Sequence, residues 1–270
     1  MSIKLIAIDI DGTLLNSGHQ LTEEVNEAIQ QAKKQGIKIV LSTGRPLAGI
    51  QTLLQQLELF SGEDFAITYN GSLVQNTETK ETVSSFNLTY DDYLEIDLLA
   101  RKLNLHLHTE SEDTIYTSNR DISPYTVHEA HLVNMPIKYR TQEEMSQDIF
   151  YIKMMLIDDP KLIDAAIPLI PENYKKRFTI VKSTPFFLEI MNKEAQKGTA
   201  LKRLAEHLGI QPSEVMAIGD NENDLSMIQY AGLGVAMENA VEIVKTHADT
   251  VTLSNDAHGV AEAIKRYALK

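Results

Sequence analysis

The sequence predicts an α/β protein in which a sheet of parallel strands is interrupted by an inserted α+β domain. At the start of the chain, short apolar runs alternate with segments of helical periodicity. This pattern stops at about residue 82, where strands come in pairs, and it returns at Lys197. Alternating strands and helices are typical of a parallel sheet. We therefore expect residues 1–82 and 193–270 to form one core domain, and residues 83–192 to form the insertion.

The first part of the chain contains the clearest alternation. Thr22 is a suitable N-cap for a helix, and Glu23 and Glu24 place negative charge in the first turn, where the helix dipole favours it. Apolar residues then recur at helical spacing as far as Gly36, a common helix stop. The elements expected in order are a strand at Ile3–Ile8, this helix, a strand at Ile37–Ser42, a helical stretch near Ile50–Leu57, and a strand at Phe65–Tyr69 that the turn dipeptide Asn70-Gly71 ends.

The insertion and the last part of the chain differ in pattern. Paired strands separated by helical segments predict an antiparallel sheet in the insertion. The expected elements there are a helix at Tyr90–Leu103 and strands at Thr114–Ser118, Tyr151–Ile157, Phe178–Val181 and Phe187–Met191. The core pattern then resumes with a helix at Lys197–Leu208, which Gly209 ends, a strand at Val215–Ile218, and a further helix, strand and helix.

Composition limits the function. Hydrophobic residues make up 43% of the 270 residues, enough for a sizeable core, and the absence of cysteine excludes disulfides and thiolate chemistry. There is neither an apolar run of about eighteen residues nor a secretory signal pattern at the N-terminus, so we expect a cytoplasmic protein. The net charge of −13 disfavours nucleic acid and anionic membranes as partners. We expect a monomer or homodimer that acts on a small molecule.

Two carboxylates, Asp9 and Asp11, follow the first predicted strand in the pentapeptide Asp9-Ile10-Asp11-Gly12-Thr13. Ligands of open α/β sheets bind at the carboxyl ends of the strands. Two carboxylates about 4 Å apart repel each other by roughly 4 kcal/mol at an effective dielectric constant of about 20. The pair therefore favours a bound cation or one protonated member. The alternative is a metal-free acidic turn, because Asp-Gly is common turn chemistry.

A second acidic cluster, Gly219-Asp220-Asn221-Glu222-Asn223-Asp224, follows another apolar strand. Asp220 stands where a metal ligand at a strand end is expected, and Asn223 and Asp224 open the next helix. The alternative is an ordinary capped helix start, because Asp and Asn are favoured caps.

Two further segments suit an anion. Thr43-Gly44-Arg45 combines a hydroxyl with backbone amides that glycine exposes, although the same residues also make an ordinary strand-to-helix turn. Lys197 opens a helix, where a positive charge opposes the helix dipole but helps to bind an anion. Taken by itself, Lys197 is expected to be a solvated surface lysine. If the ligand is a phosphate ester, a cation or such a lysine must offset the acidic character of the chain.

In chain order, these four segments resemble the motifs of the haloacid dehalogenase superfamily of phosphotransferases. Those motifs are Asp-x-Asp-Gly-Thr, a strand-end Ser or Thr, a Lys, and Gly-Asp-x-x-x-Asp. The segments DIDGTLL from Asp9, Thr43-Gly44-Arg45-Pro46, Lys197-Gly198 and GDNEND from Gly219 are similar to the Cof-type branch, and within it to bacterial sugar-phosphate phosphatases. The resemblance covers the whole chain. It implies a Rossmann-like core of the haloacid dehalogenase fold and a C2-type α+β cap at residues 83–192 that sets substrate specificity.

The resemblance also implies a reaction, the Mg²⁺-dependent hydrolysis of small phosphate monoesters, with sugar phosphates as the expected class. Asp9 is expected to attack phosphorus and form an aspartyl phosphate, while Asp11 acts as acid and base. The Mg²⁺ ligands are expected to be Asp9, the backbone carbonyl of Asp11 and Asp220. Asp224 is expected to orient a water molecule or Lys197 without binding the metal directly. Lys197 is counted with the catalytic residues, and the phosphate-binding set is Thr43, Gly44, Arg45, Lys197 and Asn223.

Two other classes of protein use similar groups. A phosphomutase would share the nucleophile and the fold, so the sequence excludes it only weakly. A receiver-type signalling domain also uses strand-end aspartates, a Thr and a Lys. The length of this chain and the presence of the Asp9–Asp11 pair on its first strand disfavour the receiver domain.

The insertion contains further candidates. Asn119 and Arg120 follow the predicted strand Thr114–Ser118, where they would read hydroxyls or a second anion of the substrate or, alternatively, form a solvated loop. Glu189, within an apolar strand, is expected either on an exposed face or pointing into the site. His106 and His108 alternate on a predicted strand, and such pairs can bind metal, but without a cluster of partners nearby they are expected to be structural or surface residues. The hinge candidates are Phe86–Asp92 and Ser183–Asn192.

Overall fold

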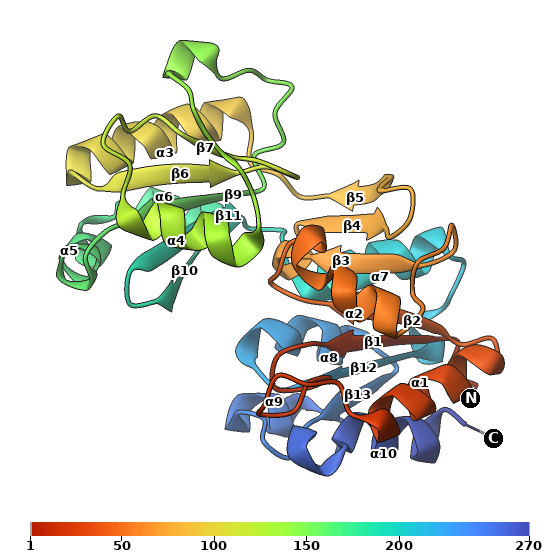
Figure 1. Cartoon of the computed structure of the whole chain (residues 1–270). Coiled ribbons are helices and arrows are strands. Elements are labelled where there is room, and N and C mark those ends of the chain that lie inside the picture. The colour runs from red at the N-terminus through yellow and green to blue at the C-terminus, as the bar shows by residue number, and fades with distance from the viewer. Residues whose placement is uncertain (1, 270) are drawn as a thin grey trace. The chain divides into compact units, whose positions relative to one another are not determined.

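The apolar run near the start of the chain forms β1 (Leu5–Asp9), an interior strand of an eight-stranded sheet (Figure 1). The computed structural model describes residues 2–269. Within the sheet the strand order is β14-β13-β12-β1-β2-β3-β4-β5. The other strands are β2 (Lys38–Ser42), β3 (Phe65–Thr68), β4 (Leu73–Asn76), β5 (Thr82–Ser85), β12 (Val215–Gly219), β13 (Leu233–Ala236) and β14 (Thr250–Val251).

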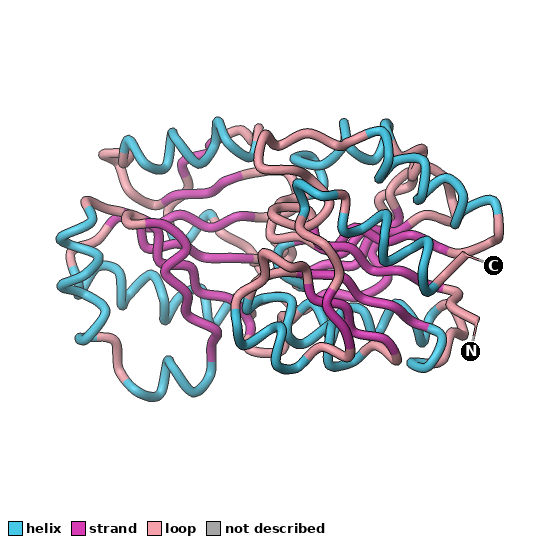
Figure 2. Tube along the Cα trace, turned by 90° about the horizontal axis from the view of Figure 1, so that it is seen from below, coloured by secondary structure: helices cyan, strands magenta, loops and turns pink. Residues whose placement is uncertain are grey.

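Helices lie on both faces of this sheet. Successive strand residues point to opposite faces, so Ile6 and Ile8 of β1 join one apolar cluster while Leu5 and Ala7 join another. Figure 2 shows helices flanking the strands on either side. The helices of this part of the chain are α1 (Glu23–Lys34), α2 (Gln51–Gln56), α7 (Lys197–His207), α8 (Leu225–Tyr230), α9 (Glu242–His247) and α10 (Gly259–Tyr267).

The predicted α/β core is confirmed, but its sheet is mixed. From β14 to β3 all neighbouring strands are parallel, whereas β4 and β5 pair antiparallel at one edge. The connection from β3 to β4 is the short turn Tyr69–Gly71, too short for the crossover that a parallel pair requires. The sequence analysis identified Asn70-Gly71 as a turn but did not predict the two strands that follow it.

The predicted cap of the first long helix is wrong in one respect. The helix α1 begins after Thr22 and buries the expected apolar residues, yet the Thr22 side chain makes no capping bond. Its hydroxyl instead lies 3.1 Å from Nδ1 of His258, which precedes α10. The Thr22 hydroxyl therefore contacts a histidine that is distant in the sequence and does not bond to the first turn of its own helix.

The insertion forms a second sheet of six strands in the order β10-β11-β9-β6-β7-β8. All neighbouring pairs in it are antiparallel except β7 with β8. Its strands are β6 (His106–Glu110), β7 (Ile115–Thr117), β8 (Ile137–Tyr139), β9 (Lys153–Ile157), β10 (Phe178–Thr184) and β11 (Phe187–Asn192), and its helices are α3 (Tyr90–Leu103), α4 (Pro124–Val133), α5 (Pro160–Ala166) and α6 (Glu172–Arg177).

The two faces of this second sheet differ in chemistry. Leu107, Leu156 and Ile190 pack with residues of α3 in an apolar core. Alternate residues of the same strands form the opposite face, where His108 contacts Thr126 of α4. That face is polar in part, and it contains the buried charges described below.

The chain divides into two compact units, one made of residues 1–85 and 196–270 and the other of residues 86–195. The predicted boundaries, after residues 82 and 192, each lie three residues earlier. The first boundary moves because β5 pairs with β4 and so belongs to the first sheet. The unit of residues 1–85 and 196–270 is called the core below, and the unit of residues 86–195 the second unit.

Candidate active site

Three adjacent parallel strands bring the predicted site segments to one edge of the core sheet. In the register of β1 and β2, Asp9 lies beside Ser42, and on the other side Ile8 lies beside Ile218 of β12. The residues that follow these strands, Thr43 and Asp220, therefore emerge next to Asp9. These residues are far apart in the sequence, but parallel pairing places the carboxyl ends of their strands at the same edge of the sheet.

Lys197 occupies the centre of the site. Its ammonium nitrogen lies 2.6 Å from Oδ1 of Asp9 and 2.6 Å from Oδ1 of Asp224, and the side chain is completely buried. Burial acts to lower the pKa of Lys197, but the two carboxylates outweigh it and raise the pKa above the ordinary value. Burial also raises the pKa of Asp9 well above its ordinary value, against the opposing effect of Lys197. The solvated alternative for Lys197 is therefore wrong.

Asp224 is fixed through both of its carboxylate oxygens. Oδ1 accepts the bond from Lys197, and Oδ2 accepts bonds from the backbone amides of Asp220 at 2.9 Å and Asn221 at 3.0 Å. The close approach requires Gly219, since a Cβ there would lie 2.6 Å from Oδ2 of Asp224. Asp224 thus holds Lys197 and the loop in place.

The third carboxylate of the cluster belongs to Asp220. Its Oδ1 accepts a 2.9 Å bond from the hydroxyl of Thr13, and burial, followed by the nearby Asp224, raises its pKa. A side chain at Gly12, where φ is +82°, would collide with this carboxylate, because a Cβ would lie 2.5 Å from Oδ2. Oxygens of Asp9, Asp220 and Asp224 all lie within 4.8 Å of one another. This is a donor set for a hard cation.

Asp11 has a different environment from Asp9. Its side chain is about half exposed, and its carboxylate receives a fork from Arg45, with Nε at 2.9 Å and Nη2 at 2.5 Å. Arg45 was expected to contact phosphate, whereas here its guanidinium is engaged with Asp11. The two carboxylates of the first motif therefore differ in burial and in partner.

The remaining expected phosphate contacts surround the same edge. Thr43 is buried, and its hydroxyl accepts a 3.1 Å bond from the amide of Arg45. Asn223 donates from Nδ2 to Oδ1 of Asn70 at 3.0 Å. A Cβ at Gly44 would lie 3.2 Å from the side-chain amide of Asn70. The structure therefore brings together Thr43, Gly44 and Asn223, and adds Asn70.

Three residues at this edge were missed by the sequence analysis. Thr13 holds Asp220, and Asn239 donates a 2.8 Å bond to the backbone oxygen of Gly12. Asn70 joins the segment around Gly44 to Asn223. Thr13 was visible in its motif, and Asn70 was visible only as a turn residue. Asn239 carries no local signal, because its partner lies 227 positions away.

The candidates in the second unit have mixed outcomes. Asn119 uses Oδ1 to accept a 2.8 Å bond from the amide of Leu107, so its side chain stabilises the sheet. Arg120 lines a polar hollow of about 570 Å³ together with Arg101 and Gln142. Glu189 is neither on an exposed face nor free, because it is buried 3.5 Å from Lys153.

Lys153 is the centre of a buried ionic cluster in the second unit. Its ammonium lies 3.2 Å from Glu110, 3.5 Å from Glu189 and 3.7 Å from Glu129, and His108 lies 3.7 Å from Glu110. His108 is 1% exposed, so it is an interior residue and not a surface one, and burial lowers its pKa. His106 is partly exposed and pairs with Asp158 at 2.7 Å.

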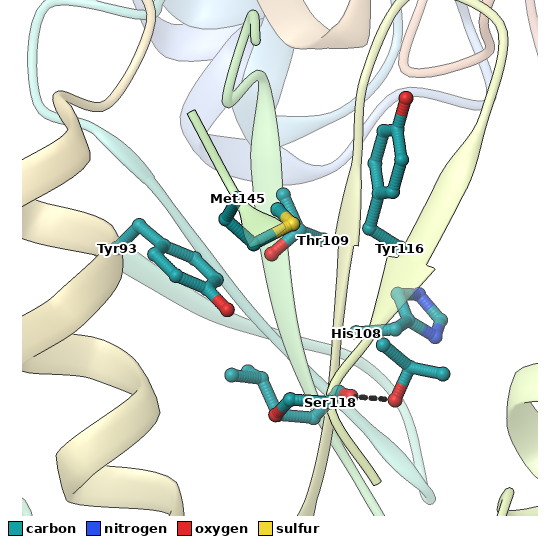
Figure 3. Close-up of a pocket in the computed structure, with 8 residues that line it drawn as sticks. Tyr93, His108, Thr109, Tyr116, Ser118 and Met145 are labelled. Carbon is teal, nitrogen blue, oxygen red and sulfur yellow. Dashed lines mark hydrogen bonds between the residues drawn. The ribbon is translucent and has the colours of Figure 1, made fainter. Parts of the chain in front are cut away.

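An indentation on the other side of the strand that carries His108 is filled by its own side chains. Figure 3 shows Tyr93, Tyr116 and Met145 around it. Thr117 also lines it, and its hydroxyl donates to the carbonyl of Leu107 at 2.7 Å. The space is too narrow to admit a water molecule. It is packing within the second unit and not a ligand site.

Fold and site together define a class of protein. A buried carboxylate–lysine–carboxylate centre at the edge of a parallel sheet, beside a hydroxyl and backbone amides, suits the handling of a phosphoryl group with a hard cation.

Within residues 2–269, no helix has the length and apolar character needed to cross a bilayer.

The comparisons with known proteins identify the family. The chain belongs to the haloacid dehalogenase-like hydrolases, whose family model matches residues 6–264. It is 52% identical over 269 residues to "Putative phosphatase M6_Spy0533" of Streptococcus pyogenes, covering 100% of both chains. The chain is a phosphatase of this family, as the sequence analysis predicted.

Two solved structures have the same fold. A haloacid dehalogenase-like hydrolase from Bacteroides thetaiotaomicron is 35% identical, with a TM-score of 0.85 and coverage of 98% of this chain and 99% of its own. The sugar phosphatase BT4131, of subclass IIB of the same superfamily, is 27% identical, with a TM-score of 0.75 and coverage of 98% of each chain. These similarities confirm the predicted fold class.

Proposed function

We propose that this phosphatase hydrolyses small phosphate monoesters, sugar phosphates above all, through an aspartyl-phosphate intermediate on Asp9 with Mg²⁺ as cofactor. One observation carries the proposal. The Asp9 carboxylate lies at the end of β1 and is held by the buried ammonium of Lys197 at 2.6 Å. A carboxylate fixed in this way can attack phosphorus in line without first losing conformational freedom.

Asp9 and Asp11 divide the chemistry. In the first step an Asp9 oxygen forms a bond to phosphorus while the bond to the ester oxygen breaks, and Asp11 gives that oxygen a proton. In the second step water attacks phosphorus, Asp11 takes the water proton, and the bond between Asp9 and phosphorus breaks to release phosphate. Asp11 is about half exposed, so it can exchange protons with solvent between the steps.

The acidic cluster fits the proposed metal. When all groups are ionised, the three carboxylates of Asp9, Asp220 and Asp224 carry three negative charges, and Lys197 carries one positive charge. The net charge of −2 matches that of a divalent cation. Mg²⁺ favours few carboxylates together with water and phosphate oxygens. The protein ligands would be Asp9, Asp220 and the backbone oxygen of Asp11. When bound, Mg²⁺ supplies positive charge that offsets the charge of the phosphoryl oxygens.

Protein groups bind the phosphoryl oxygens around this cluster. The proposed donors are the Thr43 hydroxyl, the Gly44 amide, the Lys197 ammonium and the Asn223 side-chain amide. The eleven-residue helix α7 begins at Lys197, so its dipole adds to the positive charge there. These donors hold the transferred group while its charge redistributes in the transition state.

The proposed substrate class rests on two supports. The related protein BT4131, which has the same fold, is a sugar phosphatase. The second unit, as the proposed cap, offers polar groups that suit hydroxyl-rich leaving groups, including those around Arg120. A phosphomutase of the same fold remains the second candidate, because it uses the same nucleophile.

The test is a panel of phosphorylated metabolites assayed with Mg²⁺ for release of inorganic phosphate, with Asp9→Asn as the matched control. We expect turnover of several sugar phosphates by the wild type and none by the variant. Addition of a bisphosphorylated sugar separates the candidates, because a mutase yields an isomer and a phosphatase yields free phosphate. Wild-type protein that releases no phosphate from any ester would refute the proposal.

A further inference from the structure

The turn between β3 and β4 has an unusual backbone. Three consecutive residues have positive φ, with Tyr69 at 50°, Asn70 at 55° and Gly71 at 96°. Glycine adopts this region readily and asparagine tolerates it, but for tyrosine it is unfavourable. Such a conformation persists only where the surrounding structure enforces it, and it is common at functional sites.

The surrounding structure that enforces this turn consists of two site segments. The amide of Asn70 donates to the Thr43 oxygen at 2.9 Å, and the amide of Tyr69 donates to the Arg45 oxygen at 3.3 Å. On the other side, a Cβ at Gly71 would lie only 2.8 Å from the amide nitrogen of Lys197. The turn is therefore wedged between the loop after β2 and the start of α7.

The side chain of Asn70 is directed toward the proposed phosphoryl site. Its Oδ1 accepts the 3.0 Å bond from Nδ2 of Asn223, and its amide group lies 3.2 Å from the position that a Cβ of Gly44 would take. Asn223 is itself exposed, so this bond restrains a side chain that would otherwise rotate in solvent. Asn70 thus joins two of the groups that are proposed to hold phosphate.

We propose that Asn70 is a positioning residue, which orients the side-chain amide of Asn223 and packs over Gly44 so that both face the same phosphoryl group. This inference rests on the phosphate-binding roles given to Gly44 and Asn223 under the proposed function. The left-handed turn is part of this arrangement, because the side chain makes these contacts from a residue with φ 55° and ψ 30°.

The inference predicts an effect on phosphate binding that does not depend on the leaving group. Asn70→Gly keeps the left-handed backbone and removes only the side chain. We expect kcat/KM to fall about tenfold for every ester that the wild type hydrolyses, and inhibition by inorganic phosphate to weaken by a similar factor. A merely structural role would lower the amount of folded enzyme but leave the inhibition constant of phosphate unchanged.

A matched control is available in the same chain. Asn134 has nearly the same backbone angles, φ 54° and ψ 46° against φ 55° and ψ 30° for Asn70, but it follows α4 in the second unit. Asn134→Gly should change thermal stability about as much as Asn70→Gly while leaving kcat/KM and phosphate inhibition at their wild-type values. If both variants lose phosphate affinity equally, the inference is overturned.

Two further variants keep the test decisive. Asn70→Asp keeps the turn and the acceptor for Asn223 but adds a negative charge, so it should also weaken inhibition by phosphate. In an Asn223→Ala background, Asn70→Gly should cost clearly less than it does alone, because its partner is already gone. Full additivity, or wild-type phosphate inhibition in Asn70→Asp, overturns the inference. If the wild type hydrolyses no phosphate ester, the proposed function itself is refuted instead.

Discussion

The buried cation of the second unit provides the sharpest test of the structural reasoning. Lys153 lies among Glu110, Glu129 and Glu189, and its side chain is 8% exposed. Lys153→Met removes the charge and approximately keeps the volume. It leaves the buried Glu110 carboxylate without the ammonium that lies 3.2 Å from one of its oxygens.

The pKa of Glu110 gives the direction of the effect. Burial alone would raise this pKa, but Lys153, followed by His108, lowers it from 4.5 to about 2. Removal of one partner from a buried ion pair costs roughly 3–5 kcal/mol. We therefore expect the free energy of unfolding to fall by about 3 kcal/mol near pH 8.

The loss should depend on pH in a defined direction. A carboxyl with a lowered pKa contributes stability that is present above the unfolded value, near 4.5, and disappears as pH falls toward 2. Without Lys153 that contribution is absent, and burial favours a protonated Glu110. The difference between variant and wild type should therefore be largest at pH 8 and smaller at pH 5.

The assay is urea unfolding at both pH values, followed by near-ultraviolet circular dichroism of the stacked tyrosines Tyr90, Tyr93 and Tyr151. Seven of the ten tyrosines belong to the second unit and three, Tyr69, Tyr230 and Tyr267, belong to the core, so the signal comes mainly from the unit that carries the substitution. The control is Lys182→Met on β10, where the ammonium pairs with Asp164 nearer the surface and removal should cost no more than about 1 kcal/mol. A Lys153→Met protein as stable as this control at pH 8 would show that the cluster is not energetically coupled as described.

Four other predictions concern the site and the second unit. Asp9→Asn should leave the circular dichroism spectrum unchanged and reduce turnover about a thousandfold or more, since an amide is a poor nucleophile; substantial activity in a pure variant contradicts covalent catalysis. Chelation should abolish turnover, Asp220→Ala should raise the Mg²⁺ concentration required, and Ca²⁺ should inhibit because of its larger, looser coordination; normal turnover in the chelated enzyme rules out the metal. Burial raises the pKa of Glu129 from 4.5 to about 7, so the stability that its proton contributes is complete below 4.5 and is lost as pH rises through about 7. Glu129→Gln should therefore be more stable than the wild type above pH 7 and about equal at pH 5, as measured by urea unfolding, and an equal difference at both values counts against the assignment. Arg120→Ala should raise KM or change the ranking of substrates while a small generic ester still forms the aspartyl phosphate; an unchanged ranking across the panel excludes Arg120 as a specificity residue.

The sequence by itself determined the elements whose signals are local. The helix predicted at Tyr90–Leu103 has those bounds, because the apolar spacing and the acidic first turn lie within the helix itself. The strands predicted at Ile3–Ile8 and Val215–Ile218 from short apolar runs each end one residue later, at Asp9 and Gly219. The four motifs were also recognisable from the sequence, because each is a contiguous segment and the four follow one another in the expected order.

Tertiary structure decided every contact between distant segments. Thr13 and Asp220 are 207 positions apart, and Lys197 and Asp9 are 188 apart. A pattern in sequence shows which residues suit a strand end, but it does not show which neighbour each side chain meets. The pairing of Arg45 with Asp11 and the engagement of Asn119 with Leu107 were invisible for that reason.

Burial was the other quantity that only the fold supplied. Lys197, Lys153 and Glu189 are charged residues whose local sequence is compatible with a solvated surface, yet each is enclosed by helices and strands from elsewhere in the chain. A charge is stable in the interior only with partners, and those partners come from other elements of the fold. The sequence therefore predicted which residues meet at the candidate site, and the packing of the sheets determined their burial and their neighbours.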